Sequence, residues 1–238
     1  MIHLENLEFC WEKERPPVLA IESLQITAGA HVFIEGPSGS GKSTLLSLLA
    51  GVNTPQKGSL QVLDHPLEAM SSVQRDHFRA DHIGYIFQMF NLIPYLSMVE
   101  NVTLPCRFSL QRRERALRHV DSLEQEAVRL LEHLDLAHPE LIERPVTNLS
   151  VGQQQRVAAA RALMGAPELL IADEPTSSLD NARREAFVHL LFEECSKTNS
   201  TLVFVSHDAT LEPLFDHTIK LPEINDAVRP DSLERGVH

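Results

Sequence analysis

Short apolar runs recur along the chain, and between them hydrophobic residues follow a helical spacing. Apolar, β-branched runs of this kind predict buried strands, here over residues 31–35, 83–87, 168–173 and 201–205. Helical patterns cover residues 44–50, about 150–163 and about 181–195. Strands that alternate with helices in this way predict a mostly parallel sheet with helices on both faces.

The N-terminal part of the chain follows a different pattern. Leu7, Phe9 and Trp11 lie two residues apart, so on a strand they share one face. Two further short strands are predicted over residues 18–26 and 59–63. These early strands are close in sequence and are joined by short loops, which predicts an antiparallel subsheet.

The segment after the strand at 83–87 turns helical. Its longest pattern runs over 117–134, with apolar residues at helical spacing and charges on the other face. Prolines in the last fifteen or so residues indicate a loosely organised end. The predicted division is a core of residues 1–88 and 166–222, an inserted helical subdomain of residues 89–165, and a loosely organised tail of residues 223–238.

The composition permits one α/β domain with an inserted subdomain, because the chain has 238 residues and is 43% hydrophobic. Lys and Arg number 21 against 33 Asp and Glu, which gives a formal net charge of −12. General nucleic-acid binding needs a positive field, so no nucleic-acid partner is expected. The basic cluster Arg112-Arg113-Glu114-Arg115 is interpreted as a solvated helix face.

The cellular compartment of the protein is predicted from features that are missing from its sequence. No apolar run reaches the roughly 18 residues that a membrane-spanning helix needs, and the N-terminus has no signal-peptide pattern. Cys10, Cys106 and Cys195 have no metal-ligand spacing and cannot all pair, which favours a reducing compartment. We expect a soluble protein of the cytoplasm.

Candidate chemistry begins directly after the predicted strand at 31–35. The sequence Gly36-Pro37-Ser38-Gly39-Ser40-Gly41-Lys42-Ser43-Thr44 fits the phosphate-loop pattern G-x-x-x-x-G-K-[ST]. A strand, a glycine loop and a helix N-terminus gather backbone N–H groups and the positive end of a helix dipole at one point. In such a loop Lys42 reaches the β- and γ-phosphates, and the Ser43 hydroxyl can ligate Mg²⁺. The alternative, a glycine-rich turn, leaves the rest of the motif unexplained.

Acidic residues end the predicted strand at 168–173. Asp173 can hold Mg²⁺ through water, and Glu174 can polarise an attacking water, as in a Walker B motif. His207 ends the next strand, where it could reach the γ-phosphate. A surface acid pair and a structural histidine are the alternatives, and the phosphate loop in the same chain favours the functional interpretation.

The stretch Leu149-Ser150-Val151-Gly152-Gln153 completes a recognisable set of motifs. From Leu4 to about Leu221 the chain resembles the ATP-binding subunits of ABC transporters. The phosphate loop, Gln88, the LSVGQ signature, the Walker B acids, Ser178-Leu179-Asp180 and His207 occur in the order and spacing of that family. The resemblance implies an α/β fold of the P-loop NTPase class, ABC type. That fold has a mostly parallel core sheet, an antiparallel β subdomain and an inserted helical subdomain.

The resemblance also implies the cofactors and the assembly. It implies ATP with Mg²⁺, bound between two copies of the chain arranged head to tail. Each nucleotide would lie between the phosphate loop of one copy and the signature of the other. Ser150 and Gly152 begin a helix and can offer a second anion site, and the family pattern adds Gln153 and Asp180 to the nucleotide contacts.

Further roles come from the same resemblance. Gln88 would sense Mg²⁺ and the water while it links the core to the helical subdomain, and Glu174 and His207 complete the catalytic set. Trp11 is placed where an aromatic residue stacks on adenine, although its position on the face of Leu7 and Phe9 also allows a core role.

A narrower likeness rests on residues 82–88, 91–94 and 100–102, which are similar to the ATPases of macrolide-export and lipoprotein-release systems. Such a subunit would sit at the inner face of a bacterial membrane under a separate permease, its main partner besides the second copy. Soluble ABC ATPases of DNA repair or translation are the alternative. The chain has neither the long heptad runs of the first group nor the second cassette of the other.

The chain departs from the family pattern at three places. Val151 replaces a glycine of the signature, which is tolerable if its φ is negative. The segment from Glu100 to Leu149 is longer than is usual. Leu221-Pro222-Glu223 stands where the family often has an Asp-Gly hairpin.

Overall fold

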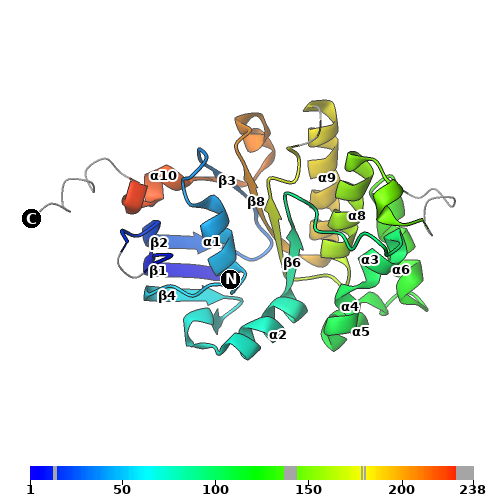
Figure 1. Cartoon of the computed structure of the whole chain (residues 1–238), viewed down its shortest axis with the longest axis horizontal. Coiled ribbons are helices and arrows are strands. Elements are labelled where there is room, and N and C mark those ends of the chain that lie inside the picture. The colour runs from blue at the N-terminus through cyan, green and yellow to red at the C-terminus, as the bar shows by residue number, and fades with distance from the viewer. Residues whose placement is uncertain (13–14, 137–143, 178, 180, 229–238) are drawn as a thin grey trace, which may run out of the picture. The chain divides into compact units, whose positions relative to one another are not determined.

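The structure is a computed structural model that describes residues 1–12, 15–136, 144–177, 179 and 181–228. The chain divides into two compact units, and Figure 1 shows its helices and strands. Unit 1 comprises Met1–Asp76 and the C-terminal part from Phe204, and unit 2 comprises His77–Val203. Helix α2 (Ser72–His82) and strand β8 (Thr201–Ser206) each contain a boundary between the units. The division predicted from sequence, with its boundaries at residues 88 and 165, stays a prediction.

Unit 1 contains a four-stranded sheet in the order β2-β1-β4-β5, whose neighbouring strands all run antiparallel. The predicted antiparallel subsheet is therefore confirmed. Its strands are β1 (Ile2–Phe9), β2 (Leu19–Ile26), β4 (Lys57–Val62) and β5 (His65–Pro66).

A β-bulge in β1 sets which of its side chains are buried. Asn6 adopts a left-handed φ of 49°, and the pairing with β4 shifts register between Glu5 and Glu8. The extra residue changes the alternation, so that Leu4 and Leu7 both point into the core although they lie three residues apart. Gly58 of β4 makes room for the bulge, because a Cβ there would stand 2.3 Å from the Asn6 carbonyl oxygen.

A parallel strand pair in unit 1 leads into the phosphate loop. β3 (His31–Glu35) pairs in parallel with β9 (His217–Lys220). Phe33 of β3 packs against the rings of Phe204 and Phe215, at centroid distances of 6.3 and 5.2 Å. Helix α1 (Lys42–Leu49) follows the loop, and Gly51, with a φ of 64°, ends it as predicted. Two 3-10 helices complete this part, η1 (Leu67–Ala69) and η3 (Ala209–Leu214).

The C-terminal segment is folded where a loose tail was predicted. A short helix α10 (Leu221–Ile224) is followed by the 3-10 helix η4 (Asp226–Val228). Leu221 and Asn225 are fully buried. The expected loose organisation is therefore wrong for residues 223–228, and residues 229–238 lie outside the described part of the chain.

Unit 2 combines a parallel strand pair with helices. β6 (Ile83–Ile86) and β7 (Leu169–Asp173) pair in parallel, with Tyr85 opposite Ile171. Helix α8 (Val151–Leu163) packs against α3 and α6, and its alanines at 158–160 are fully buried. The other elements are α3 (Met98–Thr103), α4 (Pro105–Phe108), α5 (Leu110–Ala116), α6 (Leu123–His133), η2 (Val146–Asn148), α8 (Val151–Leu163) and α9 (Asn181–Thr198).

The helical pattern predicted over 117–134 does not form one helix. α5 ends at Ala116 and α6 begins at Leu123, so Leu117 and Val120 lie in the connection. The break is capped locally, because the Ser122 hydroxyl accepts a hydrogen bond from the Gln125 N–H at 3.2 Å. No helix in the described part of the chain is long and apolar enough to cross a bilayer.

The predicted solvated face at Arg112-Arg113-Glu114-Arg115 is wrong for Arg112 and Arg115. The Arg115 side chain is only 10% exposed and pairs with Glu168 at 2.6 Å. Arg112 is buried and donates hydrogen bonds to the carbonyl oxygens of Ala162, Met164 and Ile83 at 2.7, 2.8 and 3.2 Å. Burial lowers the pKa of its guanidinium to about 10. Arg112 thus satisfies carbonyls at the C-terminal end of α8 that the helix itself leaves unpaired.

Candidate functional site

The phosphate loop presents an uncapped helix N-terminus. Gly41 is the N-cap of α1, with a left-handed φ of 99° and no side chain to cap the helix. No acidic residue stands in the first turn of α1. The first-turn N–H groups and the positive end of the helix dipole are therefore available to an external anion.

The loop is closely packed at its base and open at its tip. A Cβ on Gly36 would stand 2.5 Å from the Ser40 Oγ, so a larger residue there would require the Ser40 side chain to move. Gly39 has a φ of 81° and nothing within 4 Å of its Cβ position, which leaves a clear approach to the loop backbone. Ser40 is buried, and its Oγ has no hydrogen-bond partner within the part of the chain that is described.

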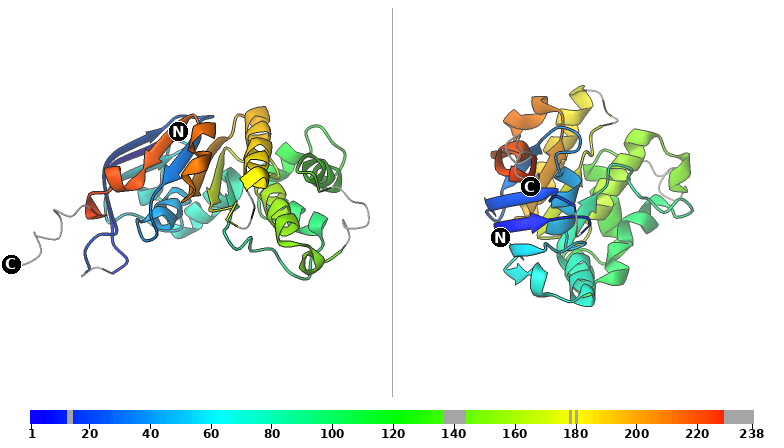
Figure 2. Two further views of the ribbon diagram at one scale, coloured as in Figure 1. Left: turned by 90° about the horizontal axis from the view of Figure 1, so that it is seen from above. Right: turned by 60° about the vertical axis from the view of Figure 1, so that its left-hand side comes forward.

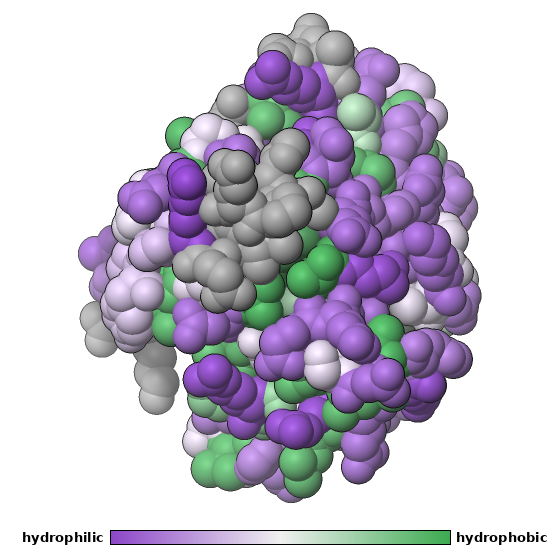
Figure 3. Space-filling view, turned by 90° about the vertical axis from the view of Figure 1, so that its right-hand side faces the viewer, coloured by the Kyte–Doolittle hydropathy of each residue, from purple (hydrophilic) through white to green (hydrophobic). Residues whose placement is uncertain are grey.

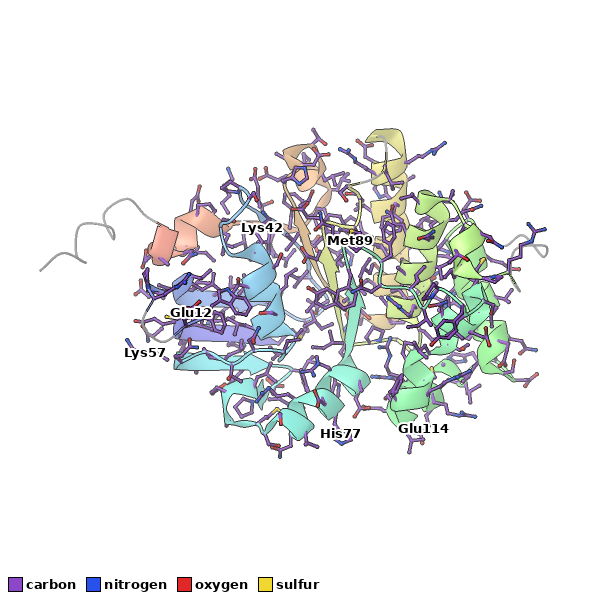
Figure 4. All side chains as sticks on the ribbon, in the orientation of Figure 1. Glu12, Lys42, Lys57, His77, Met89 and Glu114 are labelled. Atoms are coloured by element: carbon purple, nitrogen blue, oxygen red, sulfur yellow. The ribbon has the colours of Figure 1, made fainter. Side chains whose placement is uncertain are left out.

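Lys42 is held across this loop. Its Nζ donates hydrogen bonds to the carbonyl oxygens of Gly36 at 2.7 Å and Pro37 at 3.0 Å. Figure 4 shows Lys42 at the loop end of α1. The ammonium group therefore lies where the loop curves, so its charge adds to that of the helix N-terminus.

His207 is brought to the same place within unit 1. It follows β8, is exposed, and lines a cavity of about 430 Å³ together with the first residues of the loop. The residues that line this cavity are Glu35, Gly36, Pro37, His207, Lys220, Pro222 and Glu223.

Trp11 is not a core residue. β1 ends at Phe9, and the Trp11 side chain is 59% exposed. Its ring stands edge-on to Phe9, with centroids 5.1 Å apart and planes at 87°. The core alternative is thus wrong, while stacking on adenine stays a prediction.

In unit 2 the two acids stand at the carboxyl end of β7. Asp173 is the last residue of the strand. Burial, with a smaller contribution from the negative charge of Asp173, raises the pKa of Tyr85. Glu174 takes a left-handed φ of 46°, a conformation that costs about 1–3 kcal/mol in a residue other than glycine. The turn therefore fixes the direction of the Glu174 side chain at some cost in stability.

Gln88 lies on an exposed turn after β6 that is anchored from α8. Phe90 and Asn91, which follow it, have left-handed φ values of 60° and 48°. The Arg161 guanidinium donates to the carbonyl oxygens of Phe90 at 2.6 Å and Asn91 at 2.7 Å. The helix that begins with the signature therefore holds the loop that carries Gln88.

The signature forms the N-terminus of α8. The Ser150 hydroxyl accepts from the Gln153 N–H at 3.3 Å, and the Gln153 side chain accepts from the Ser150 N–H at 2.9 Å, which confirms the predicted capping box. Val151 is the first helical residue, is 53% exposed and has no positive φ, so its side chain is tolerated. A Cβ on Gly152 would meet only Leu179, at 3.7 Å, so a glycine here leaves room for a group from outside the unit.

The donor set suits Mg²⁺. In the part of the chain that is described, no three His, Cys, Asp or Glu side chains gather as a metal cluster. Mg²⁺ needs no such cluster, because it keeps several waters and takes phosphate oxygens with one or two protein oxygens. Unit 1 carries such an oxygen on Ser43, which is exposed, and unit 2 carries a carboxylate on Asp173 and an amide oxygen on Gln88. Their joint role as Mg²⁺ ligands stays a prediction. Asp180 and Ser178 lie outside the described residues.

Each unit therefore assembles part of the predicted site. Unit 1 brings the loop, Lys42 and His207 together, and unit 2 carries Gln88, the signature and the two acids. Sequence reasoning missed Arg161 and Asn225. Arg161 lies within a regular helical pattern, and the residues around Asn225 form no recognisable motif.

The chain is similar to known proteins over most of its length. The family described as "ABC transporter" matches residues 19–177. A lipoprotein-releasing system ATP-binding protein LolD from Psychrobacter arcticus is 39% identical over 206 residues, 86% of this chain and 87% of that protein. A macrolide export ATP-binding/permease protein MacB from Rhodopirellula baltica is 35% identical over 207 residues, 87% of this chain but 29% of that longer protein.

A solved structure agrees with these matches. It is the dimeric structure of a post-hydrolysis state of the ATP-binding cassette MJ0796 bound to ADP and Pi. It superposes with a TM-score of 0.79 at 32% identity, and the match covers 93% of this chain and 95% of that one. The predicted fold class is confirmed.

Proposed function

The chain belongs to the ABC transporter family and is an ATPase of the ABC type, and we propose that it powers a transporter of the lipoprotein-release or macrolide-export kind from beneath a separate permease. The observation that carries this proposal is that one chain holds both an uncapped α1 N-terminus, crossed by Lys42, and a signature helix with a complete capping box. The similarity to LolD and MacB supports transport over the alternatives of DNA repair and translation.

The residues of the chain divide the chemistry among them. The loop N–H groups and Lys42 bind the β- and γ-phosphates of ATP, and Ser43, Gln88 and Asp173 hold Mg²⁺. Mg²⁺, when bound, neutralises charge on those phosphates. Glu174 accepts a proton from the attacking water, and His207 contacts the γ-phosphate side of the site.

The signature completes the site in a second copy of the chain. Ser150, Gly152 and Gln153 stand at a helix N-terminus, where anions are stabilised. The open space beside Gly152 suits the phosphates carried by a partner copy. The family resemblance adds Asp180 to these nucleotide contacts. The MJ0796 cassette is dimeric, which supports a dimer of this chain as well.

ATP hydrolysis and membrane capture test the proposal together. The purified chain should hydrolyse ATP in the presence of Mg²⁺, and a tagged copy expressed in its host should copurify with an integral-membrane protein. If it hydrolyses ATP but copurifies only with soluble proteins or nucleic acid, the transport role is wrong. If it neither binds nor hydrolyses ATP, the whole proposal fails.

Replacing Trp11 with alanine should weaken ATP binding by about 1–3 kcal/mol, the scale of base–aromatic stacking. The indole is exposed and held by Phe9, so it can cover a purine whose phosphates the loop fixes. Trp11→Tyr should restore most of the affinity. ATP should also change the fluorescence of this sole tryptophan. An unchanged Kd for ATP in a folded Trp11→Ala variant would rule out stacking.

A permease contact is expected at residues 87–96. Met89 and Tyr95 are 80% and 79% exposed, and Figure 4 shows Met89 on the loop after β6. Arg161 anchors this loop to α8, so a movement of the signature helix would be transmitted to a partner bound to the loop. Met89→Glu should therefore abolish transport in membranes containing the permease while the basal ATPase of the isolated chain persists.

Leu110→Glu is the matched control for Met89→Glu. Leu110 is 78% exposed and is the first residue of α5, outside the segment 87–96. Hydrophobic side chains gather at the lower edge of the face in Figure 3. Transport should survive Leu110→Glu. Loss of both fold and basal ATPase in Met89→Glu would instead assign Met89 to the core of the subdomain.

A further inference from the structure

The folded C-terminal segment reaches back to the phosphate loop within unit 1. α10 and η4 both contact β2, and Figure 2 shows the red-orange end of the chain beside the blue strands. The Cδ of Pro222 lies 3.4 Å from the position that a Cβ on Gly36 would take. This segment therefore packs against the beginning of the loop.

Asn225 ties the same segment to the far end of the loop. Its Nδ2 donates to the carbonyl oxygens of Val18 at 3.0 Å and Ser40 at 3.2 Å. Its Oδ1 accepts from the N–H groups of Ala20 at 2.9 Å and Ala227 at 3.2 Å. An amide side chain offers two donor hydrogens and two acceptor lone pairs, so all of them are used. Asn225 is fully buried and cannot touch a nucleotide itself.

The bond to Ser40 fixes the direction of the next N–H group. The Ser40 carbonyl and the Gly41 N–H belong to one planar trans peptide, in which they point in opposite directions. With its carbonyl held by Asn225, this peptide aims the Gly41 N–H away from the C-terminal segment. Gly41 is also confined from β2, because a Cβ on it would stand 2.7 Å from Leu19 Cδ2.

We propose that Asn225 is a positioning residue for the nucleotide, which holds the Ser40–Gly41 peptide so that the Gly41 N–H donates to a phosphate oxygen. The inference rests on the proposed function, because it requires a nucleotide in the phosphate loop. The segment at the C-terminal end thereby sets the affinity of a loop that lies 185 positions earlier in the sequence. An amide is needed here, because two carbonyls and two N–H groups face one side chain.

Asn225→Asp tests the role with little change in shape. The carboxylate keeps an acceptor for Ala20 but loses both donors and sets a negative oxygen against the Val18 and Ser40 carbonyls. We expect the Kd values for ATP and for ADP each to rise about tenfold, because the net loss of one well-placed hydrogen bond has that scale. The factor should be the same for both nucleotides, since both place a β-phosphate in the loop. Calorimetric titration well below the unfolding midpoint of each variant measures this.

Asn101→Asp is the matched control. Asn101 is also fully buried, and its Nδ2 donates to the carbonyl oxygens of Ile93, Leu96 and Ser97 in unit 2. Both variants should unfold at lower temperature, and only Asn225→Asp should bind nucleotide more weakly. Wild-type affinity in folded Asn225→Asp, or an equal loss in Asn101→Asp, overturns the positioning role. If the wild-type chain itself binds no ATP, the proposed function fails and this inference fails with it.

A measurement on the wild-type chain covers the case in which Asn225→Asp does not fold. Coupling between two sites is reciprocal, so a nucleotide held by the loop should stabilise the docked segment. Hydrogen–deuterium exchange of the amides in residues 221–228 should therefore slow when ATP or ADP is added. Exchange that is unchanged at saturating nucleotide would contradict the proposal.

Discussion

Replacing Glu174 with glutamine is expected to lower ATP hydrolysis by at least about a hundredfold, the scale for loss of a general base, while ATP and Mg²⁺ still bind. Glutamine has the same shape and fits the left-handed turn no worse than glutamate, so the change removes the base and leaves the backbone as it was. The variant should accumulate as an ATP-bound dimer, which light scattering can detect. Single-turnover kinetics measure the chemical step even if product release limits steady-state turnover.

Glu168 provides the control for this experiment. It directly precedes β7, at the opposite end of the strand from Glu174, and its Oε1 pairs with Arg115 at 2.6 Å. Glu168→Gln should lower stability and leave the rate of hydrolysis per folded molecule unchanged. Near-normal single-turnover hydrolysis by Glu174→Gln would assign the water to another residue, with His207 the first to test.

The elements predicted well from the sequence are those whose structure is determined by residues close to them in the chain. The phosphate loop is one continuous motif whose strand, glycines and helix lie next to one another. The signature helix was predicted at both ends, because Ser150 and Gln153 form its capping box and Gly165 follows its last turn. In both cases the residues that fix the structure lie within a few positions of it.

The features that the sequence did not predict depend on distant partners. Arg112 looked solvated because it stands in a charged run, yet it is buried by carbonyls about fifty positions away. The bulge at Asn6 needs a glycine on the neighbouring strand at position 58. Asn225 stands among prolines, and its partner Ser40 is near the other end of the chain. A pattern within a short stretch of sequence cannot reveal contacts between residues that lie so far apart in the chain.

Lys42 belongs to a local sequence motif, but its hydrogen bonds span the phosphate loop. Lys42→Ala removes a charge from the β- and γ-phosphates and also two hydrogen bonds, to the carbonyls of Gly36 and Pro37. Charge-assisted hydrogen bonds contribute about 1.5–3 kcal/mol each, so the affinity for ATP should fall by on the order of a hundredfold or more. Equilibrium binding of labelled ATP measures the loss.

Lys57→Ala serves as the control for this loss of ATP affinity, and Lys42→Arg separates the contribution of charge from that of loop shape. Lys57→Ala removes an exposed lysine of the same unit, paired with Glu8 at 2.7 Å and labelled with Lys42 in Figure 4, and it should leave ATP affinity unchanged. Lys42→Arg keeps the charge but presents a planar fork in place of a compact ammonium. Affinity should therefore recover in part, and only as far as the guanidinium reaches the phosphates. If Lys42→Ala binds ATP as tightly as the wild-type chain does, the nucleotide does not occupy this loop, because no other cation of the motif could replace the lost charge.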